Sequence, residues 1–189
     1  MIRKFAANQN WAKATPWLGI ITAVLLFVFF NPANSMFWAL VNIPLYLFHQ
    51  MEEHYKPGGF KQYVNQVVNK LPAGKEALTD VKIFWINILL VWVAFAIFGA
   101  LAFVNIGFGL LIIIFSLINC ATHIGTAIRQ KEWNPGLVVA AVQFALSIYG
   151  AYFISVHGDI SNLLVWWIAT LLVSILAHVI LFKLILKKV

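Results

Sequence analysis

The stretch His49-Gln50-Met51-Glu52-Glu53-His54 puts two imidazoles and two carboxylates at the end of an apolar run. The whole chain has only five histidines and six acidic residues, so this one segment holds a large share of them. In lipid, such side chains are costly unless they are paired, protonated or bound to a metal. The segment is therefore the first candidate for a functional site.

The composition around this segment predicts an integral membrane protein. Of the 189 residues, 62% are hydrophobic and 10% are charged, whereas about 25% of a soluble domain is charged. The net charge of +7 would suit nucleic acid, but the basic residues cluster at the ends of apolar runs, which indicates orientation in a membrane. We therefore expect membrane lipid as a partner and no nucleic acid. The sequence does not set an oligomeric state.

The apolar runs predict an all-α helical bundle that forms a single membrane domain over residues 1–189. We expect six transmembrane helices, at about residues 16–31, 35–54, 82–104, 106–128, 137–156 and 162–186. The second of these ends in the polar segment. Pro44 should kink it and free a carbonyl near its polar end.

Between the second and third spans, apolar residues recur at helical spacing from Phe60 to Leu71, and lysines and amides, Asn65 among them, occupy the other face. This pattern predicts an amphipathic helix at about residues 60–71 that lies in the membrane surface. Such a helix would act as a lid beside the polar segment, or would only be a linker that rests on the headgroups. The pattern leaves both interpretations open.

The distribution of Lys and Arg predicts the orientation of the spans. All thirteen lie in the amino-terminal segment, the 55–82 loop, the 129–131 loop and the carboxyl-terminal segment. The positive-inside rule then places both termini in the cytoplasm of an inner or plasma membrane protein. His123 lies six residues before Arg129, about 9 Å along a helix, and His178 has a similar depth. We expect these histidines and residues 49–54 to share one level, in a cavity that opens towards the cytoplasm.

The spacing within the polar segment favours a metal site. His49 and Glu53 are one helical turn apart and can ligate one cation, and the adjacent Glu52 is the candidate catalytic general base. The pattern is close to the H-x-x-E-H arrangement of inverted zinc proteases, with Glu53 in place of the second histidine. A third ligand has to come from another helix, where His123 is the first choice and His178 the second.

Other polar residues are possible additional members of the site. His54 lies about 140° round the helix from His49, so we expect it to join only if the helix unwinds before the next proline. Tyr46 shares a helix face with His49 and Glu53. Asn119 and Gln143 also belong to this group, although such amides more often form hydrogen bonds between helices.

The residues His49-x-x-Glu52-Glu53 resemble the signature of the HXXEE-domain family of small polytopic membrane proteins. His123 followed by Asn134-Pro135-Gly136-Leu137 is similar to the downstream pattern of that family. The resemblance extends from about residue 35 to 186. It implies that His49, Glu52, Glu53 and His123 form a site, and it implies no particular reaction, because the family is named for its motif.

Three functions are compatible with these residues. The first is a metal-dependent membrane enzyme, a hydrolase or transferase with a divalent metal, zinc before iron, that acts on a lipid or isoprenoid. The second is an iron-dependent membrane oxidoreductase whose dinuclear site would use Glu52, Glu53 and Asn119. The third is a non-enzymatic protein that binds lipid or handles ions or protons, although polar residues do not continue to the outer side as a carrier requires.

Overall fold

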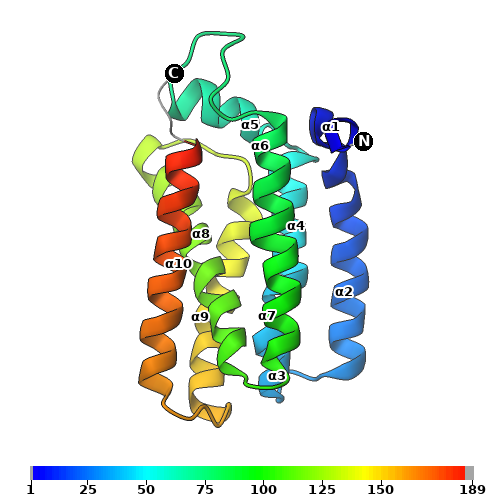
Figure 1. Cartoon of the computed structure of the whole chain (residues 1–189), viewed down its shortest axis with the longest axis vertical. Coiled ribbons are helices and arrows are strands. Elements are labelled where there is room, and N and C mark those ends of the chain that lie inside the picture. The colour runs from blue at the N-terminus through cyan, green and yellow to red at the C-terminus, as the bar shows by residue number, and fades with distance from the viewer. Residues whose placement is uncertain (1, 186–189) are drawn as a thin grey trace.

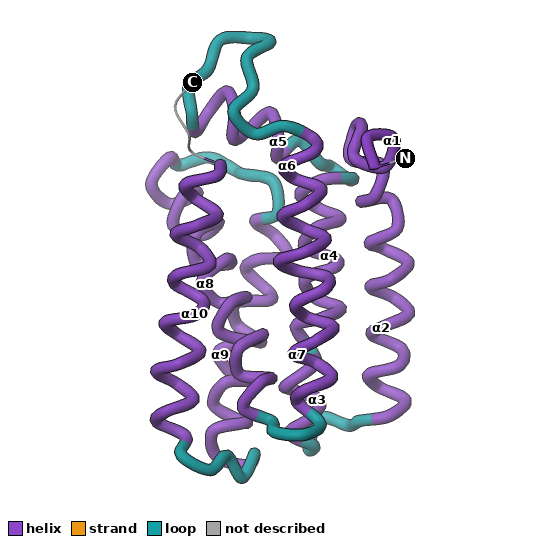
Figure 2. The backbone as a smooth tube through the Cα atoms, in the orientation of Figure 1, coloured by secondary structure: helices purple, strands orange, loops and turns teal. Residues whose placement is uncertain are grey.

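The computed structural model describes residues 2–185, and every regular element in this range is helical (Figure 2). The predicted all-α fold is thus confirmed for the described residues. In chain order the elements are α1 (Ile2–Ala6), η1 (Ala7–Ala14), α2 (Thr15–Phe29), α3 (Ser35–Leu40), α4 (Asn42–His54), α5 (Phe60–Gln62), η2 (Tyr63–Val68), α6 (Asp80–Trp85), η3 (Ile86–Val93), α7 (Ala94–Ala102), α8 (Gly107–Gln130), α9 (Leu137–His157) and α10 (Leu163–Ile185).

Five helical stretches within residues 2–185 are long and apolar enough to cross a membrane. They are Arg3–Phe29, Asp80–Ala102, Gly107–Gln130, Leu137–His157 and Leu163–Ile185. Their outward faces are apolar as well, since Val28 on α2 is 68% exposed and Leu164 on α10 is 72% exposed in the isolated chain. Apolar surface of this kind is typical of helices that lipid covers. Five of the six expected spans are therefore present as long apolar helices.

The expected second span, residues 35–54, differs from the other five. It is built from α3 and α4, which meet end to end at Val41, so neither helix reaches the length of a complete crossing. The interruption lies one turn before Pro44, because proline has no N–H to donate to the carbonyl four residues earlier and its ring crowds that carbonyl. An interruption of the helix near Pro44 is therefore present, but it lies in the half of the segment away from the polar end, and Val41 keeps right-handed helical dihedrals.

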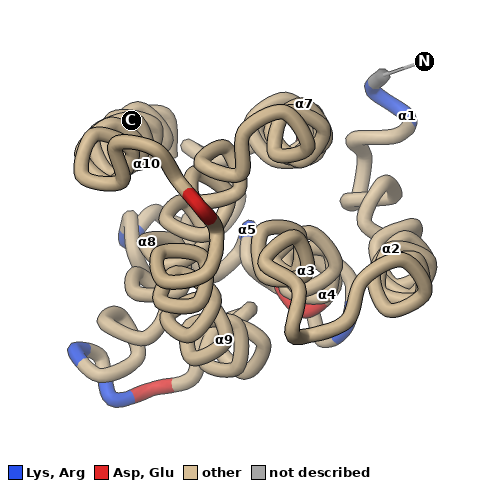
Figure 3. Tube along the Cα trace, turned by 90° about the horizontal axis from the view of Figure 1, so that it is seen from below, with Lys and Arg blue, Asp and Glu red and all other residues tan. Residues whose placement is uncertain are grey.

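The helices form a bundle around α8. In its most apolar window, 56% of α8 is buried, compared with 22–33% for the other four long helices. The end-on view shows α8 between α9 and α10, with α3 and α4 beside it (Figure 3). Both ends of the described chain and the α5–η2 helix lie at the upper end of the bundle in Figure 1. The opposite end contains α3 and an apolar core cluster that includes Phe37, Trp38, Leu110, Ile113 and Ile154.

The expected amphipathic helix is present but shorter than predicted. It runs across the upper end of the bundle as α5 and η2, from Phe60 to Val68 (Figure 1). It ends before Leu71 because Lys70 takes a left-handed backbone conformation, with φ of 52°. Asn65, expected on the polar outer face, is buried, and its side chain bonds the backbone of Ala77 and Leu78 at 2.8–2.9 Å. The buried amide thus fixes the next loop against this helix.

Glycine permits the close approach of α8 to α3. A Cβ atom on Gly109 would lie 2.5 Å from the Cβ and 3.0 Å from the Cα of Ala39. By contrast, a Cβ atom on Gly125, four turns further along the same helix, would meet nothing within 4 Å. The two glycines therefore have opposite packing environments.

We expect Gly109→Ala to unfold more easily than Gly125→Ala. The added methyl group overpacks the α3–α8 contact in the first variant, which costs about 1–3 kcal/mol, whereas the second gains helix propensity of about 1 kcal/mol. Thermal unfolding of the two variants in the same detergent measures this difference. Equal midpoints would contradict the close helix contact.

Candidate functional site

The polar end of α4 supplies two members of the site. His49 and Glu53 lie one turn apart on the buried face of α4, and His49 Nε2 is 3.6 Å from Glu53 Oε2. Neither side chain reaches solvent appreciably, because His49 is 0% and Glu53 6% exposed. A buried carboxylate of this kind needs a positively charged or hydrogen-bonded partner.

The third member comes from α8. His123 Nε2 lies 3.2 Å from the other oxygen of Glu53, Oε1. The ring centroids of His49 and His123 are 4.7 Å apart. His49, Glu53 and His123 each offer one ligand atom, and these atoms all lie within 4.8 Å of one another, so the group could hold a metal ion. The structure thus brings together His49 and Glu53, which the spacing paired, and His123, the first choice for a third ligand.

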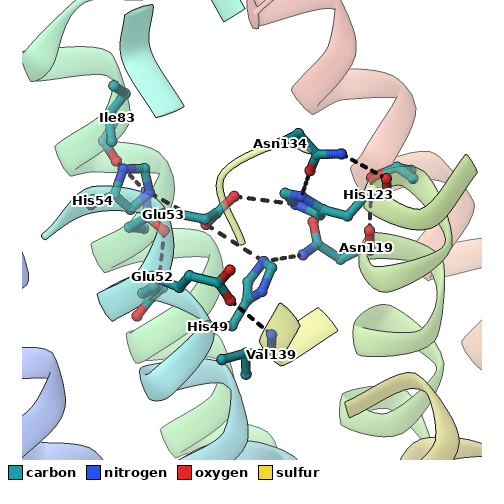
Figure 4. Close-up of polar contacts among 12 residues, drawn as sticks. His49, Glu52, Glu53, His54, Ile83, Asn119, His123, Asn134 and Val139 are labelled. Atoms are coloured by element: carbon teal, nitrogen blue, oxygen red, sulfur yellow. Dashed lines mark hydrogen bonds and ion pairs between the residues drawn. The ribbon is translucent and has the colours of Figure 1, made fainter. Parts of the chain in front are cut away.

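Asn134 fixes the ring of His123 (Figure 4). Its amide nitrogen donates to the backbone carbonyl of His123 at 2.9 Å, so its oxygen is the atom that faces His123 Nδ1 at 2.8 Å. An amide oxygen only accepts, so Nδ1 carries a proton, and Nε2 faces the Glu53 carboxylate at 3.2 Å either as the N–H of a charged ring or as the lone pair of a neutral ring. In the neutral state the two facing acceptors suit a cation between them, and a histidine oriented through its other nitrogen is typical of metal sites.

Asn119 contacts the group from the same helix as His123. Its amide nitrogen is 3.0 Å from His49 Nε2 (Figure 4). The structure therefore places Asn119 beside the group, as expected for an additional member. A metal bound at His49 Nε2 would take the place of this hydrogen bond, which makes Asn119 a neighbour of the ligands.

The loop before α9 packs directly on the group through Gly136. A Cβ atom there would lie 2.7 Å from both Glu53 Cγ and His49 Cε1, and 3.1 Å from His123 Cε1. The φ of 93° at Gly136 also disfavours any residue with a side chain. Sequence reasoning missed Gly136 and Asn134 as site residues, although the Asn-Pro-Gly turn signature was the signal that could have identified them.

Glu52 has a different environment from the one expected of a general base. Its two carboxylate oxygens accept hydrogen bonds from the backbone N–H groups of Val138 at 3.1 Å and Val139 at 2.7 Å. Figure 4 shows the bond from Val139. These N–H groups belong to the first turn of α9, where a carboxylate is favourable because the N–H groups have no partner within the helix. Since both oxygens are engaged, the structure assigns Glu52 to joining α4 and α9, and the expected role as a base is not supported.

His54 reaches the group without any unwinding of α4. It is still the last helical residue, yet its Nε2 lies 3.4 Å from Glu53 Oε2. Its ring packs against Trp11 and Phe60, with centroids 5.1 and 5.3 Å away. His54 therefore contacts the Glu53 carboxylate from a helix that does not unwind, but it is not one of the three residues whose ligand atoms lie together.

The remaining expected members lie outside the His49–Glu53–His123 group. His178 is buried on α10, where its Nδ1 contacts the Ser174 carbonyl oxygen at 2.8 Å, and it is not one of the three residues whose ligand atoms lie within 4.8 Å of one another. Tyr46 packs its ring against that of His49, with centroids 5.5 Å apart. Gln143 donates a hydrogen bond to Asn42 Oδ1 at 2.9 Å. Within the described residues, Gln143 forms no hydrogen bond with the His49–Glu53–His123 group.

Two cavities adjoin the group and differ in character. One of about 410 Å³ has mainly apolar walls, provided by α8, α10 and the α5–η2 helix, and it contacts Asn119 and His123. The other, of about 220 Å³, has polar walls that include Glu53, His54, Lys61 and Asp80. Phe60 lines both cavities. The possible metal site thus lies between an apolar and a polar space.

The fold and the site together define a helical protein with membrane-spanning character and a buried group that could hold a metal. The sequence model of a family described as "Protein of unknown function with HXXEE motif" matches residues 40–150. The chain belongs to this HXXEE family, as the resemblance predicted. The match ends before α10, so His178 lies beyond it. No curated protein and no solved structure matches the chain.

We expect Glu52→Gln to destabilise the protein. The substitution removes the negative charge and turns one acceptor into a donor that faces a backbone N–H group, which costs about 1–3 kcal/mol of unfolding free energy. Thermal unfolding measures the loss, with the exposed Glu132→Gln as the matched control. Unchanged stability would remove the structural role of Glu52 and leave it available as a base.

Proposed function

We propose that this protein is a metal-dependent membrane enzyme, a hydrolase that acts on a lipid or isoprenoid, with zinc bound by His49, Glu53 and His123. The observation that carries the proposal is the position of this buried group between an apolar and a polar cavity. Hydrolysis of a lipid needs such an arrangement, because a hydrocarbon substrate and water have to meet at one point from different environments. If the enzyme is a transferase, another polar acceptor molecule takes the place of water.

Two imidazole nitrogens and one carboxylate oxygen are a ligand set that zinc enzymes use, with the fourth position open to water. When bound, the ion would lower the pKa of that water and polarise a substrate carbonyl. Other residues of the chain position the ligands and separate the two cavities. Asn134 orients His123, Glu52 holds α9 and its Gly136 loop against α4, and Phe60 separates the hydrocarbon side from the polar side.

The proposed topology has six crossings, with α3 and α4 together forming the second. Both ends of the described chain lie at the upper end of the bundle in Figure 1, as does the α5–η2 helix. Lys and Arg are absent from the turns at 31–35, 104–107 and 157–161, so the positive-inside rule favours a cytoplasmic upper end in an inner or plasma membrane. The site would then open near the cytoplasmic headgroups.

The two alternatives have less support. A dinuclear iron site would need Glu52 as a ligand, but both oxygens of that carboxylate are bonded to α9. A carrier would need a polar path through the whole bundle, but the end opposite the site is filled by the cluster of Phe37, Trp38 and Leu110. Neither alternative explains why an apolar and a polar cavity adjoin the His49–Glu53–His123 group.

We expect purified protein to contain about one zinc ion per chain, in line with a single three-residue site. His49→Ala and His123→Ala should each lose most of it, because a site left with two ligands binds poorly. The control is His157→Ala, which removes an exposed histidine outside the site. Elemental analysis of detergent-purified protein makes the measurement. Metal-free wild-type protein after growth with added zinc would refute the proposal.

Asn134→Ala should weaken zinc affinity without removing a ligand. Loss of the partner that orients a metal-bound histidine typically costs about 10–100-fold in affinity. Competition with a zinc chelator measures the change, with the exposed Asn10→Ala as control. An affinity equal to that of the wild type would show that Asn134 does not orient a ligand.

A further inference from the structure

The apolar cavity beside His123 has features that define its ligand more narrowly than a lipid in general. Its volume of about 410 Å³ is near the small end of the range for ligand pockets, about 300–1,000 Å³. A space of this size suits one hydrocarbon chain better than the two chains of a typical bilayer lipid. The walls that would hold this chain include Val64, Val68, Leu181, Phe182 and Ile185.

The cavity opens through the side of the bundle. Among its lining residues, Ala121 and Gly125 on α8 and Phe182 on α10 are exposed on the outer surface. In a bilayer this surface faces acyl chains, since α8 and α10 are both long apolar helices. The α5–η2 helix covers the cavity from the headgroup side through Phe60 and Tyr63. A ligand would thus enter sideways from the bilayer, between α8 and α10.

The polar lining that the described residues 2–185 give this cavity consists of histidines and uncharged side chains. Lys, Arg, Asp and Glu are missing from this described part of the lining. Phosphate groups are usually bound by Arg or Lys, so this lining does not favour a phosphorylated lipid. A neutral head is a better match.

His178 indicates which neutral head fits. It lines the cavity at 4% exposure, and its Nδ1 must donate to the Ser174 carbonyl oxygen, which can only accept. Nε2 of the neutral ring is then an acceptor, and it is buried with no partner among the described residues. A buried acceptor of this kind favours a ligand that carries a hydroxyl donor.

We propose that the apolar cavity binds a single-chain, uncharged lipid with a hydroxyl group, which enters between α8 and α10 and donates a hydrogen bond to His178. This inference rests on the proposed function, because a lipid alcohol is the product of ester hydrolysis, or the acceptor in the transferase reaction, at that same site. It assigns His178 as a positioning residue in place of the ligand role first considered for it.

The test uses a photoreactive long-chain alcohol with a diazirine in its tail and the full chain in lipid nanodiscs. Peptide mass spectrometry locates the label, which we expect on α8 and α10. Gly125→Leu should lower this labelling by about tenfold, because its side chain occupies open space in the cavity without a clash at Cβ. Ala145→Leu, on an exposed position of α9, should label like the wild type. Equal labelling of both variants would overturn the assignment of the cavity.

Two competitors with the same tail test the head group. The free alcohol should displace the label better than its methyl ether or its phosphate monoester. His178→Phe should abolish the preference for alcohol over ether, and His178→Gln, which retains an acceptor, should restore part of it. A preference that survives in His178→Phe, or a phosphate monoester that competes equally, would overturn the proposed head group.

Zinc content measured on the same preparations separates this inference from the proposed function. Gly125→Leu should keep the zinc of the wild type while it loses the label, since Gly125 is not a ligand. Metal-free protein that still labels selectively on α8 and α10 would leave the lipid site in place and remove the enzyme. Zinc-bound protein with no selective labelling would remove the lipid site and leave the proposed metal enzyme in place.

Discussion

The carboxylate of Glu53 is buried among three imidazoles, and the rest of the structure is arranged around that contact. His49 and His54 come from the same helix, and His123 comes from the centre of the bundle. A buried carboxylate without partners would be strongly destabilising. The need to compensate it ties the polar end of α4 to α8, and this requirement sets where the two helices meet.

The surrounding elements hold this contact in place through hydrogen bonds and through one close backbone contact. Glu52 accepts from the first turn of α9, Asn134 bonds both the ring and the backbone of His123, and Gly136 lies against the group where a side chain would clash. Hydrogen bonds between α4, α8 and α9 therefore converge on one point, while the opposite end of the bundle is packed with apolar side chains. Rigid positioning of this kind is what a metal or catalytic site requires.

The apolar and polar cavities on either side of Phe60 relate this geometry to function. In the proposed function, a bilayer would supply hydrocarbon to the open side of α8 and α10, and the headgroup side would supply polar molecules through the space near His54 and Lys61. The short α5–η2 helix separates the two, because its apolar face turns towards the bundle and Asn65 fixes the following loop to it. The helix is thus a structural part of the site, which favours the lid over the linker interpretation.

The sequence by itself determined the helical class, the five long apolar helices and the pairing of His49 with Glu53 on one helix face, because hydrophobic length and helical spacing depend only on local order. It indicated His123 as their partner only through its similar depth in the membrane. It also indicated that Pro44 disturbs its helix, although it placed the freed carbonyl near the polar end and the interruption lies at Val41. Only the tertiary structure decided that Glu52 accepts hydrogen bonds from the backbone of α9 and that His54 folds back onto Glu53. It also placed His178 outside the His49–Glu53–His123 group, and Asn134 and Gly136 against that group. These outcomes depend on which side chains of distant segments meet, and helical periodicity gives the face of a residue but not its partner across the bundle.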